Sequence, residues 1–517
     1  MPLRRTAALV AIWCACAAPA AVPAPARLPD AVVRAIDAVS TADLKSYVEV
    51  LASDKLKGRG VGESGNRQAE EFICETLKKH GVSPAGADGS CFQPFAITQP
   101  ALGPRARLVI KAADGSIRDE FRGGSDFYPL PDSGSGEVTG RLVFAHYGVT
   151  TANGTHDDYA GLETAGAIAM VLDGAPDALR GDRTALLTSK LENAAAHGVR
   201  GLLVVTDSPA GARQVWPESD ASPRSTSYKL ASDLQSSLPV ATLSQKAAQP
   251  LLDALARNEP LAATLTPDVA GKTVTVHNVL GFVEGRDADR RGEMVVIGAH
   301  LDHDGTDAEG RIYNGADDNA SGTAAVIAVA AAMARASAAG ERPARSVLFA
   351  LWNGEEKGSL GAFAFVAAPQ PARRVVANLN LDMVGRNEEV PDPADWRFAG
   401  MPKVAASASL NTLHVLGYSY SPDLVAELRE ANEAIGLTLK EDYDFGIHNL
   451  VQRSDQWAFL SHGIPALFLT TGLHPDYHTP DDDAARIDFG KLTRVARLAA
   501  RAVWIIAEGA EPALKKR

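Results

Sequence analysis

The chain has 517 residues, of which 46% are hydrophobic and 22% are charged, as in ordinary globular proteins. One hydrophobic core rarely supports that length, so two or more domains are expected. The formal net charge of -12 argues against non-specific binding of nucleic acid, which requires a basic surface, and we expect no nucleic-acid partner.

The N-terminus has the pattern of a secretory signal peptide. Positive charge in MPLRR is followed by the short apolar run TAALVAIWCACAA and by small residues that offer Ala-x-Ala cleavage sites. We therefore assign residues 1–26 to a signal peptide and expect an exported protein, periplasmic or secreted. The alternatives are a membrane anchor, for which the apolar run is short, twin-arginine export through Arg4 and Arg5, and lipidation of Cys14 or Cys16.

Removal of the signal peptide leaves two cysteines, Cys74 and Cys91. In an oxidising compartment they could form a disulfide, and two unpaired buried thiols are the alternative. Neither arrangement indicates a thiolate metal site. No later segment is both free of charge and long enough to cross a bilayer, so we expect no stable membrane span after signal removal. The sequence predicts no particular oligomeric state.

The first part of the mature chain, residues 27–130, is predicted to begin the main domain. Residues 41–82 follow a helical pattern, and in GNRQAEEFICETLKKHGV the apolar residues recur on one helix face, with Asn66 as the start and Gly81 as the stop. CFQPFAI and ARLVIKA then predict strands. The stretch RGGSDFYPLPDSGSGEVTG, at 122–140, is rich in glycine, serine and proline and indicates a domain boundary.

Residues 136–262 have their own alternation of strand and helix. GRLVFAHYGV, AGAIAMVLDG and LPVATLS predict strands, and LENAAAHGVRGLLVVTD predicts a helix, a glycine turn and a strand. This segment has no tight cluster of His, Asp and Glu. We therefore expect a smaller inserted α/β domain without a catalytic role.

From residue 272 to 517 predicted strands alternate with long helices. The strands are HNVLGFVEG, EMVVIGAH, SVLFALWN, VVANLNLDMV, TLHVLGY and IPALFLTT, and the main helices are 319–339, 422–436 and 488–508. This alternation predicts an α/β fold with a mostly parallel mixed sheet and helices on both faces. In such sheets ligands bind beyond the carboxyl ends of the strands.

Imidazole and carboxylate side chains follow the ends of several of these strands. They are His300, Asp302, Glu355, Glu356, Asp382 and His478, with Asp317 and Asp318 just before an alanine-rich helix. Each one alone has an ordinary explanation, such as a helix cap or a solvated surface pair. Together they would concentrate negative charge at one edge of the sheet, and a bound dication would relieve that repulsion.

The types of ligand indicate zinc. Imidazole and carboxylate without thiolate suit Zn²⁺ or a similar first-row dication, and Co²⁺ or Mn²⁺ are the alternatives. The set is larger than one tetrahedral ion needs. Two ions about 3.5–4 Å apart, bridged by one carboxylate, use it better.

Six segments of the chain resemble the di-zinc aminopeptidases of metallopeptidase clan MH, which include bacterial leucyl aminopeptidase and aminopeptidase Y. The segments are LKGRGVGESGN, GAHLDHDG, IYNGADDNASG, NGEEKGSLGA, NLDMVGR and PDYHTPDDD. The resemblance implies a phosphorylase/hydrolase-like zinc peptidase fold. By its position, the insert resembles a protease-associated (PA) domain.

The resemblance also implies how the metals are held. His300 and Asp382 would bind one zinc, Glu356 and His478 would bind the other, and Asp317 would bridge the two ions. Four protein ligands and one shared carboxylate would thus hold the pair.

Further roles follow from the same resemblance. Asp318 would follow Asp317 across an unusual peptide bond, and Glu355 would be the general base. Asp302 would orient His300, with Asp455 as a weaker candidate for similar support, and Tyr477 would steady the oxyanion. Adjacent residues point in different directions, so one glutamate of the Glu-Glu pair can face a metal while the other faces the attacking water.

The predicted activity is that of an exported aminopeptidase, which hydrolyses peptides with a free N-terminus. A carboxypeptidase or dipeptidase on the same scaffold is the first alternative; it would need a basic pocket, for which Arg311, Arg386 and Arg453 lie nearby in sequence. A glutaminyl cyclase would keep one zinc, and a catalytically dead, receptor-like binding protein would have lost ligands.

Overall fold

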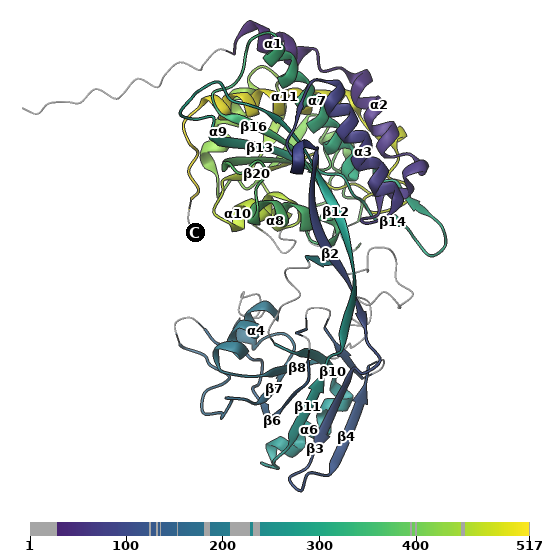
Figure 1. Ribbon diagram of the computed structural model, residues 1–517, viewed down its shortest axis with the longest axis vertical. Coiled ribbons are helices and arrows are strands. Elements are labelled where there is room, and N and C mark those ends of the chain that lie inside the picture. The colour runs from purple at the N-terminus through teal and green to yellow at the C-terminus, as the bar shows by residue number, and fades with distance from the viewer. Residues whose placement is uncertain are drawn as a thin grey trace, which may run out of the picture.

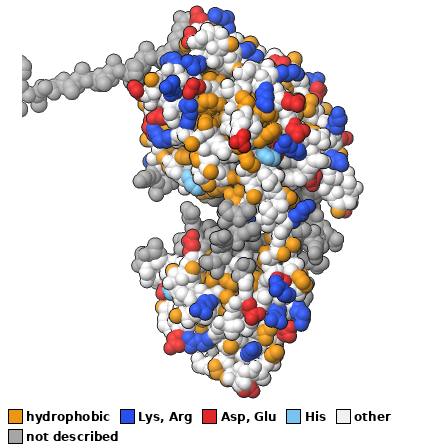
Figure 2. All heavy atoms as spheres, viewed as in Figure 1, with side chains coloured by type: hydrophobic (Ala, Val, Ile, Leu, Met, Phe, Trp, Pro, Cys, Tyr) orange, Lys and Arg blue, Asp and Glu red, His pale blue; other side chains and the backbone are white. Residues whose placement is uncertain are grey.

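The computed structural model describes residues 28–123, 126–130, 133–134, 136–151, 154–179, 187–206, 228–230, 238–392, 395, 397–398, 401–445 and 450–515. The chain forms two lobes, and the long antiparallel strands β2 (Phe92–Leu102) and β12 (Val269–Val283) run from one lobe into the other (Figure 1). The space-filling view shows a notch between the lobes (Figure 2). The signal peptide predicted at 1–26 lies outside the described residues.

The larger lobe contains a sheet that has ten strands among the described residues. Its order is β19-β18-β20-β17-β13-β16-β12-β2-β9, and β1 pairs with β12. The bounds of the further strands are Ser83–Pro84 (β1), Lys229–Leu230 (β9), Glu293–His300 (β13), Ser346–Trp352 (β16), Arg374–Leu381 (β17), Thr412–Leu416 (β18), Thr438–Lys440 (β19) and Ala466–Thr470 (β20). Strands β16, β13, β17 and β20 are parallel, and β12 and β2 pair antiparallel with their neighbours. Strand β18 pairs antiparallel with β20 and parallel with β19. The predicted mixed α/β fold is confirmed, with its main parallel block at the centre.

Helices cover both faces of this sheet. The helices of one face are α1 (Asp30–Asp37), α2 (Thr41–Leu51), α3 (Ser64–Lys79), α7 (Gly322–Ala338), α9 (Pro422–Asn432) and α11 (Phe489–Glu508), and those of the other are α8 (Leu360–Ala367) and α10 (Gln456–Ser461). Side chains alternate between the two cores because successive residues of a strand point to opposite faces: Val295 packs in the first core and Val296 in the second. The stretch Ala316–Ala338 is apolar enough to span a membrane, but 89% of its most apolar window is buried inside the protein.

The smaller lobe has an eight-stranded sheet within the described part of the chain, in the order β4-β3-β11-β6-β7-β8-β10-β5. The strands are Arg107–Lys111 (β3), Ile117–Arg122 (β4), Phe127–Pro129 (β5), Val138–Phe144 (β6), Ile168–Leu172 (β7), Gly201–Thr206 (β8), Val240–Ser244 (β10) and Ala262–Thr266 (β11), with helices Leu187–Ala196 (α4) and Gln245–Ala256 (α6). The insert is therefore wider than the predicted 136–262, since strands assigned to 27–130 belong to its sheet. The glycine-rich stretch is internal to this lobe, and the chain crosses between lobes within β2 and β12, which have ordinary strand sequences.

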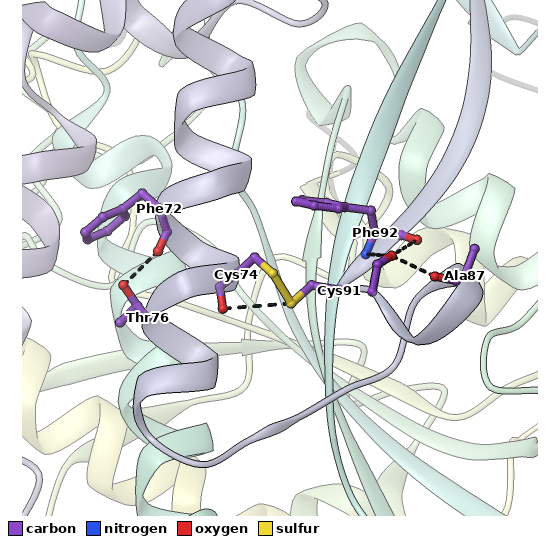
Figure 3. The surroundings of a disulfide bond; sticks show 7 residues. Phe72, Cys74, Thr76, Ala87, Cys91 and Phe92 are labelled. Carbon is purple, nitrogen blue, oxygen red and sulfur yellow. Dashed lines mark hydrogen bonds between the residues drawn. A yellow bond between two sulfur atoms is a disulfide. The ribbon is translucent and has the colours of Figure 1, made fainter.

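Two details near the N-terminus bear on the predictions. The first differs from the prediction, and the second decides between two alternatives. Helix α3 begins at Ser64, and the predicted start, Asn66, lies in its first turn and donates hydrogen bonds to the Arg59 carbonyl and the Asn353 side chain. Cys74 of α3 and Cys91, just before β2, form a disulfide (Figure 3). Of the two alternatives left open by the sequence, the structure has the paired one.

Candidate metal centre

Four neighbouring parallel strands end at the same edge of the larger sheet, and a candidate ligand follows or ends each strand. Strand β13 ends at His300, and β17 is followed directly by Asp382. After β16 a single 3-10 turn carries Glu355 and Glu356, and after β20 a loop carries His478. Parallel topology thus brings together side chains that are up to 178 residues apart in sequence.

The remaining carboxylate comes from the π-helical turn Ala316–Ser321 at the start of α7. Gly315, before this turn, has φ 57°, and a Cβ there would lie 2.1 Å from the Asp318 carbonyl oxygen and 2.4 Å from the His303 ring. Only glycine fits this position. The turn contains a cis peptide bond between Asp318 and Asn319.

The carboxylate of Asp318 lies between two imidazoles. Its Oδ1 is 3.3 Å from Nε2 of His300, and its Oδ2 is 2.8 Å from Nε2 of His478. Asp382 Oδ1 is also 3.3 Å from the His300 nitrogen, and Glu356 Oε2 is 3.5 Å from the His478 nitrogen. The side chains therefore form two groups that share Asp318.

This geometry corrects the prediction that Asp317 is the shared carboxylate. The Asp317 side chain faces away from the two groups: its Oδ1 accepts a hydrogen bond from the Gly385 backbone nitrogen at 2.7 Å, and its Oδ2 is 3.2 Å from Nε2 of His474. Because neighbouring residues of the turn point in different directions, only one of the two aspartates can face both His300 and His478. Asp482, which the sequence analysis did not single out, accepts hydrogen bonds from the backbone nitrogens of both aspartates.

Asp302 supports the centre through the backbone of its neighbours. Its carboxylate oxygens accept hydrogen bonds from the backbone nitrogens of Glu355 and Glu356, at 3.0 and 3.3 Å, and its carbonyl oxygen is 3.2 Å from Nδ1 of His300. The predicted contact with His300 is therefore made by the backbone, while the carboxylate oxygen lies 3.9 Å from that nitrogen. The side chain mainly holds the turn that carries the two glutamates.

The sequence analysis missed two further residues of the segment HLDHDG. Nδ1 of His303 is 2.7 Å from Oε1 of Glu356, and Asp304 Oδ2 is 3.3 Å from Nδ1 of His478. Each contact fixes the orientation of a candidate ligand. Both residues lie within four positions of His300 in the sequence, and this closeness could have identified them as candidates for the site.

Arg59, in the segment LKGRG, joins the loops of the centre to each other. Its buried guanidinium donates hydrogen bonds to the carbonyl oxygens of Leu301, Leu51, Asn314 and Gly315 at 2.6 to 2.9 Å. The loop after β13 and the loop before the Asp318 turn are thereby held by one side chain. Burial lowers the pKa of Arg59 to about 10, so it stays charged at neutral pH.

The segment RSDQWAF contributes a further buried carboxyl group, that of Asp455. Ser454 donates a hydrogen bond to Oδ2 of Asp382 at 2.6 Å. Asp455 is fully buried, its oxygens have no hydrogen-bond partner among the described residues, and burial raises its pKa well above the usual range. The charge of Asp455 contributes to the raised pKa of Glu355, and the weaker supporting role predicted for Asp455 stays a prediction.

The buried carboxylates and imidazoles of the centre lie close together and shift one another's pKa values. Burial raises the pKa of Glu355 well above its usual range, and the negative charges of Glu356 and Asp382 contribute further. Burial alone would lower the pKa of His478, but Glu356 and Asp318 raise it to about 10. Protons on imidazole thus balance the carboxylates, and a bound dication would displace those protons and take over that role.

The donor set fits a first-row dication. Two groups of side chains place possible ligand atoms within 4.8 Å of one another; they are His300, Asp318 and Glu356, and Asp304, Glu356 and His478. Asp304 faces Nδ1 of His478, while Asp318 faces Nε2. We therefore regard Asp304 as orienting the ring rather than as a ligand.

A cavity of about 330 Å³ opens beside the centre. Asp318, Glu355, Glu356, Asp382 and His478 contribute to one part of its lining, and the rest is largely apolar, including Phe363, Leu416, Trp457 and Phe468. Tyr477 also lines it, and its ring centroid is 4.0 Å from that of His478. A substrate side chain could occupy the apolar part while its peptide bond lies at the carboxylates.

Comparison with known families agrees with this geometry. Residues 278–503 match the model of peptidase family M28, and residues 138–251 match that of the PA domain. Residues 278–503 therefore form a peptidase family M28 domain. The M28 match contains every candidate ligand. Among the described residues, the PA match lies in the smaller lobe except for β9, which pairs with β2 in the larger sheet.

Among individual proteins, an aminopeptidase of Pseudomonas aeruginosa is 27% identical over 387 residues, which are 72% of this chain and 61% of the relative. A probable glutamate carboxypeptidase of Arabidopsis thaliana is 29% identical over 221 residues, 41% of this chain and 27% of the relative. The solved structure of an aminopeptidase from Aneurinibacillus sp. strain AM-1 has a TM-score of 0.53 at 20% identity and covers 94% of this chain and 98% of its own. That likeness supports the M28 fold of this chain.

Proposed function

We propose that this M28 protein is a zinc-dependent aminopeptidase. The observation that carries the proposal is the position of Asp318, whose two carboxylate oxygens face the imidazoles of His300, at the end of β13, and of His478, in the loop after β20. One carboxylate with a histidine at each oxygen suits a pair of dications. The similarity to an aminopeptidase over 72% of this chain supports the choice of reaction.

The candidate ligands divide between two ions. We assign His300 and Asp382 to one ion, Glu356 and His478 to the other, and Asp318 to both; Co²⁺ and Mn²⁺ are the alternatives to Zn²⁺. When bound, the ions would supply Lewis-acid polarisation of the scissile carbonyl and a water of lowered pKa.

Glu355 is the residue we assign to proton transfer. Its side chain lines the cavity, 12% of it is exposed, and its Oε2 is 3.9 Å from Nε2 of His300, so it stands beside the ligands. It would accept a proton from the attacking water and deliver it to the leaving amine. Asp302 would fix the backbone of Glu355 during both transfers. We assign the stabilisation of the oxyanion to Tyr477, which lines the cavity beside His478.

A carboxypeptidase is the second candidate. The observation that favours it is an arginine, Arg453, on the wall of the cavity, and a relative that matches 41% of this chain is named a probable glutamate carboxypeptidase. Cleavage of leucyl-leucine amide and N-acetyl-leucyl-leucine separates the candidates: an aminopeptidase cleaves the first, and a carboxypeptidase cleaves the second.

The variant Glu355→Gln tests the assigned base. We expect it to retain the wild-type zinc content and to lose about 100- to 10,000-fold in kcat on leucyl-p-nitroanilide. Glu309→Gln, an exposed glutamate that pairs with Arg311, is the matched control and should keep its activity. Wild-type turnover by Glu355→Gln would refute the assignment.

We also propose that the protein is exported. The support is the signal-peptide pattern at 1–26 and the disulfide between Cys74 and Cys91, since disulfides persist in oxidising compartments. N-terminal sequencing of the mature protein should find that cleavage has occurred near residue 26; an intact Met1 in a cytosolic fraction would contradict this.

A further inference from the structure

An arginine, Arg453, lines the cavity beside the metal centre. Among the described lining residues Arg453 is the only lysine or arginine, and the lining also holds four carboxylates. The residue is exposed, and within the described part of the chain its guanidinium forms no ion pair. Its charge is therefore available to a ligand that enters the cavity.

The other two arginines near the centre in sequence are already paired. Arg386 is 2.8 Å from Oδ2 of Asp476, and Arg311 is 2.7 Å from Oδ2 of Asp307. Neither lines the cavity. Of the three candidates for a basic pocket, only Arg453 has both the position and the free charge.

The backbone of Arg453 is fixed relative to the metal centre. The next residue, Ser454, donates a hydrogen bond to Asp382, and the side chain of Gln456 donates one to the Val451 carbonyl oxygen at 2.7 Å. Arg453 thus extends from a segment that is tied on one side to a candidate ligand. These hydrogen bonds therefore fix the position of the Arg453 backbone relative to the metal centre.

The surroundings of Arg453 strengthen its attraction for an anion. Leu450, Leu416, Trp457 and Phe468 line the same cavity, and apolar surfaces reduce the dielectric screening of a charge inside it. The carboxylates of the centre do not compensate it, because Asp318, Asp382 and Glu356 face imidazoles. A planar guanidinium matches a carboxylate with two parallel hydrogen bonds.

We propose that Arg453 binds a carboxylate of the substrate, so that this enzyme prefers short peptides that carry an anion beyond the scissile bond. The proposal rests on the proposed exopeptidase function and adds the class of substrate. The carboxylate has two possible sources, the C-terminus of a dipeptide or an acidic side chain after the scissile bond. Both present the same group to Arg453.

The test is a comparison of kcat/KM within matched substrate pairs. Leucyl-leucine against leucyl-leucine amide measures the contribution of a terminal carboxylate, and leucyl-glutamate amide against leucyl-glutamine amide measures that of a side chain. We expect the wild-type enzyme to prefer the anionic member of at least one pair about five- to tenfold, the range of a partly exposed charge-assisted pair. The pair that shows the preference identifies the source of the carboxylate.

Substitutions of Arg453 test whether this residue causes the preference for the anionic substrate. Arg453→Gln should bring the ratio within the preferred pair close to one, Arg453→Lys should keep part of it, and Arg311→Gln, the matched exposed arginine, should keep all of it. Zinc content and Tm of Arg453→Gln should equal those of the wild type, which shows that the variant is folded. An unchanged ratio in Arg453→Gln, or equal cleavage within both pairs by the wild type, would overturn the proposal for Arg453 alone. Failure of the wild type to cleave any of these peptides would instead overturn the proposed aminopeptidase function, and this proposal with it.

Discussion

The carboxylate of Asp302 accepts a hydrogen bond from the backbone nitrogen of Glu355, with 3.0 Å between the two atoms. Asp302 is fully buried, so solvent does not compete for this bond. It connects the end of strand β13, which carries His300, to the turn that carries the proposed base. The relative position of the candidate ligand His300 and the proposed base Glu355 therefore depends on a residue that does not line the cavity.

Replacement of Asp302 should impair this positioning. We expect Asp302→Ala to lower kcat/KM or zinc affinity by roughly 10- to 100-fold, the usual effect of removing a residue that supports a metal ligand. Asp302→Asn keeps one acceptor oxygen and should lose less. Zinc titration together with kinetics on leucyl-p-nitroanilide would show this. If Asp302→Ala matched the wild type in both measurements, the positioning role would be wrong.

Arg59 should matter mainly for stability. A lysine cannot reach four carbonyl oxygens in the fork geometry of a guanidinium, so Arg59→Lys leaves buried acceptors unpaired. We expect a loss of about 2–4 kcal/mol in the free energy of unfolding, measured as a lower Tm. Arg67→Lys is the control, since Arg67 is 43% exposed and pairs with the buried Glu70 and the exposed Glu71 of α3. Equal Tm shifts in the two variants would contradict the role of Arg59.

The comparison of sequence and structure shows which features a pattern can predict. Strand ends identified His300, Glu355, Glu356 and Asp382 because a parallel sheet brings its carboxyl ends to one edge. The choice between Asp317 and Asp318 failed because it depends on the backbone of one irregular turn, in which a shift of one residue exchanges the two side chains. Sequence spacing carries no information about that turn.

The domain boundary failed for a related reason. A stretch rich in glycine, serine and proline predicts a linker, but here it connects strands within the smaller lobe, and the true crossings lie inside β2 and β12. A strand that continues from one domain into another has no break in its composition. Long-range strand pairing, which decides the boundary, cannot be seen in a single sequence.

The pH dependence of stability should contain a contribution from Glu427 on α9. Burial raises the pKa of Glu427 to about 7, and the neighbouring Asp423 adds to the shift. The pKa of Glu427 in the folded state exceeds its unfolded value of about 4.3. Ionisation of Glu427 therefore destabilises the fold increasingly as the pH rises from about 4 to 7, and the destabilisation is complete above about pH 7. Glu427→Gln should therefore be more stable than the wild type at pH 8, by about 1–3 kcal/mol, and should lose this advantage near pH 4. Tm measured across this range would show it; Glu433→Gln, at the exposed end of the same helix, is the control, and a gain that did not depend on pH would contradict the assignment.

The central claim is that Asp318, and not its neighbour, is shared by two metal ions. Zinc bound per chain, measured after dialysis for the wild type, Asp318→Asn and Asp317→Asn, tests it most directly. The wild type and Asp317→Asn should each retain two equivalents, whereas Asp318→Asn should retain one or none. Two equivalents in Asp318→Asn, or their loss in a folded Asp317→Asn, would contradict the account.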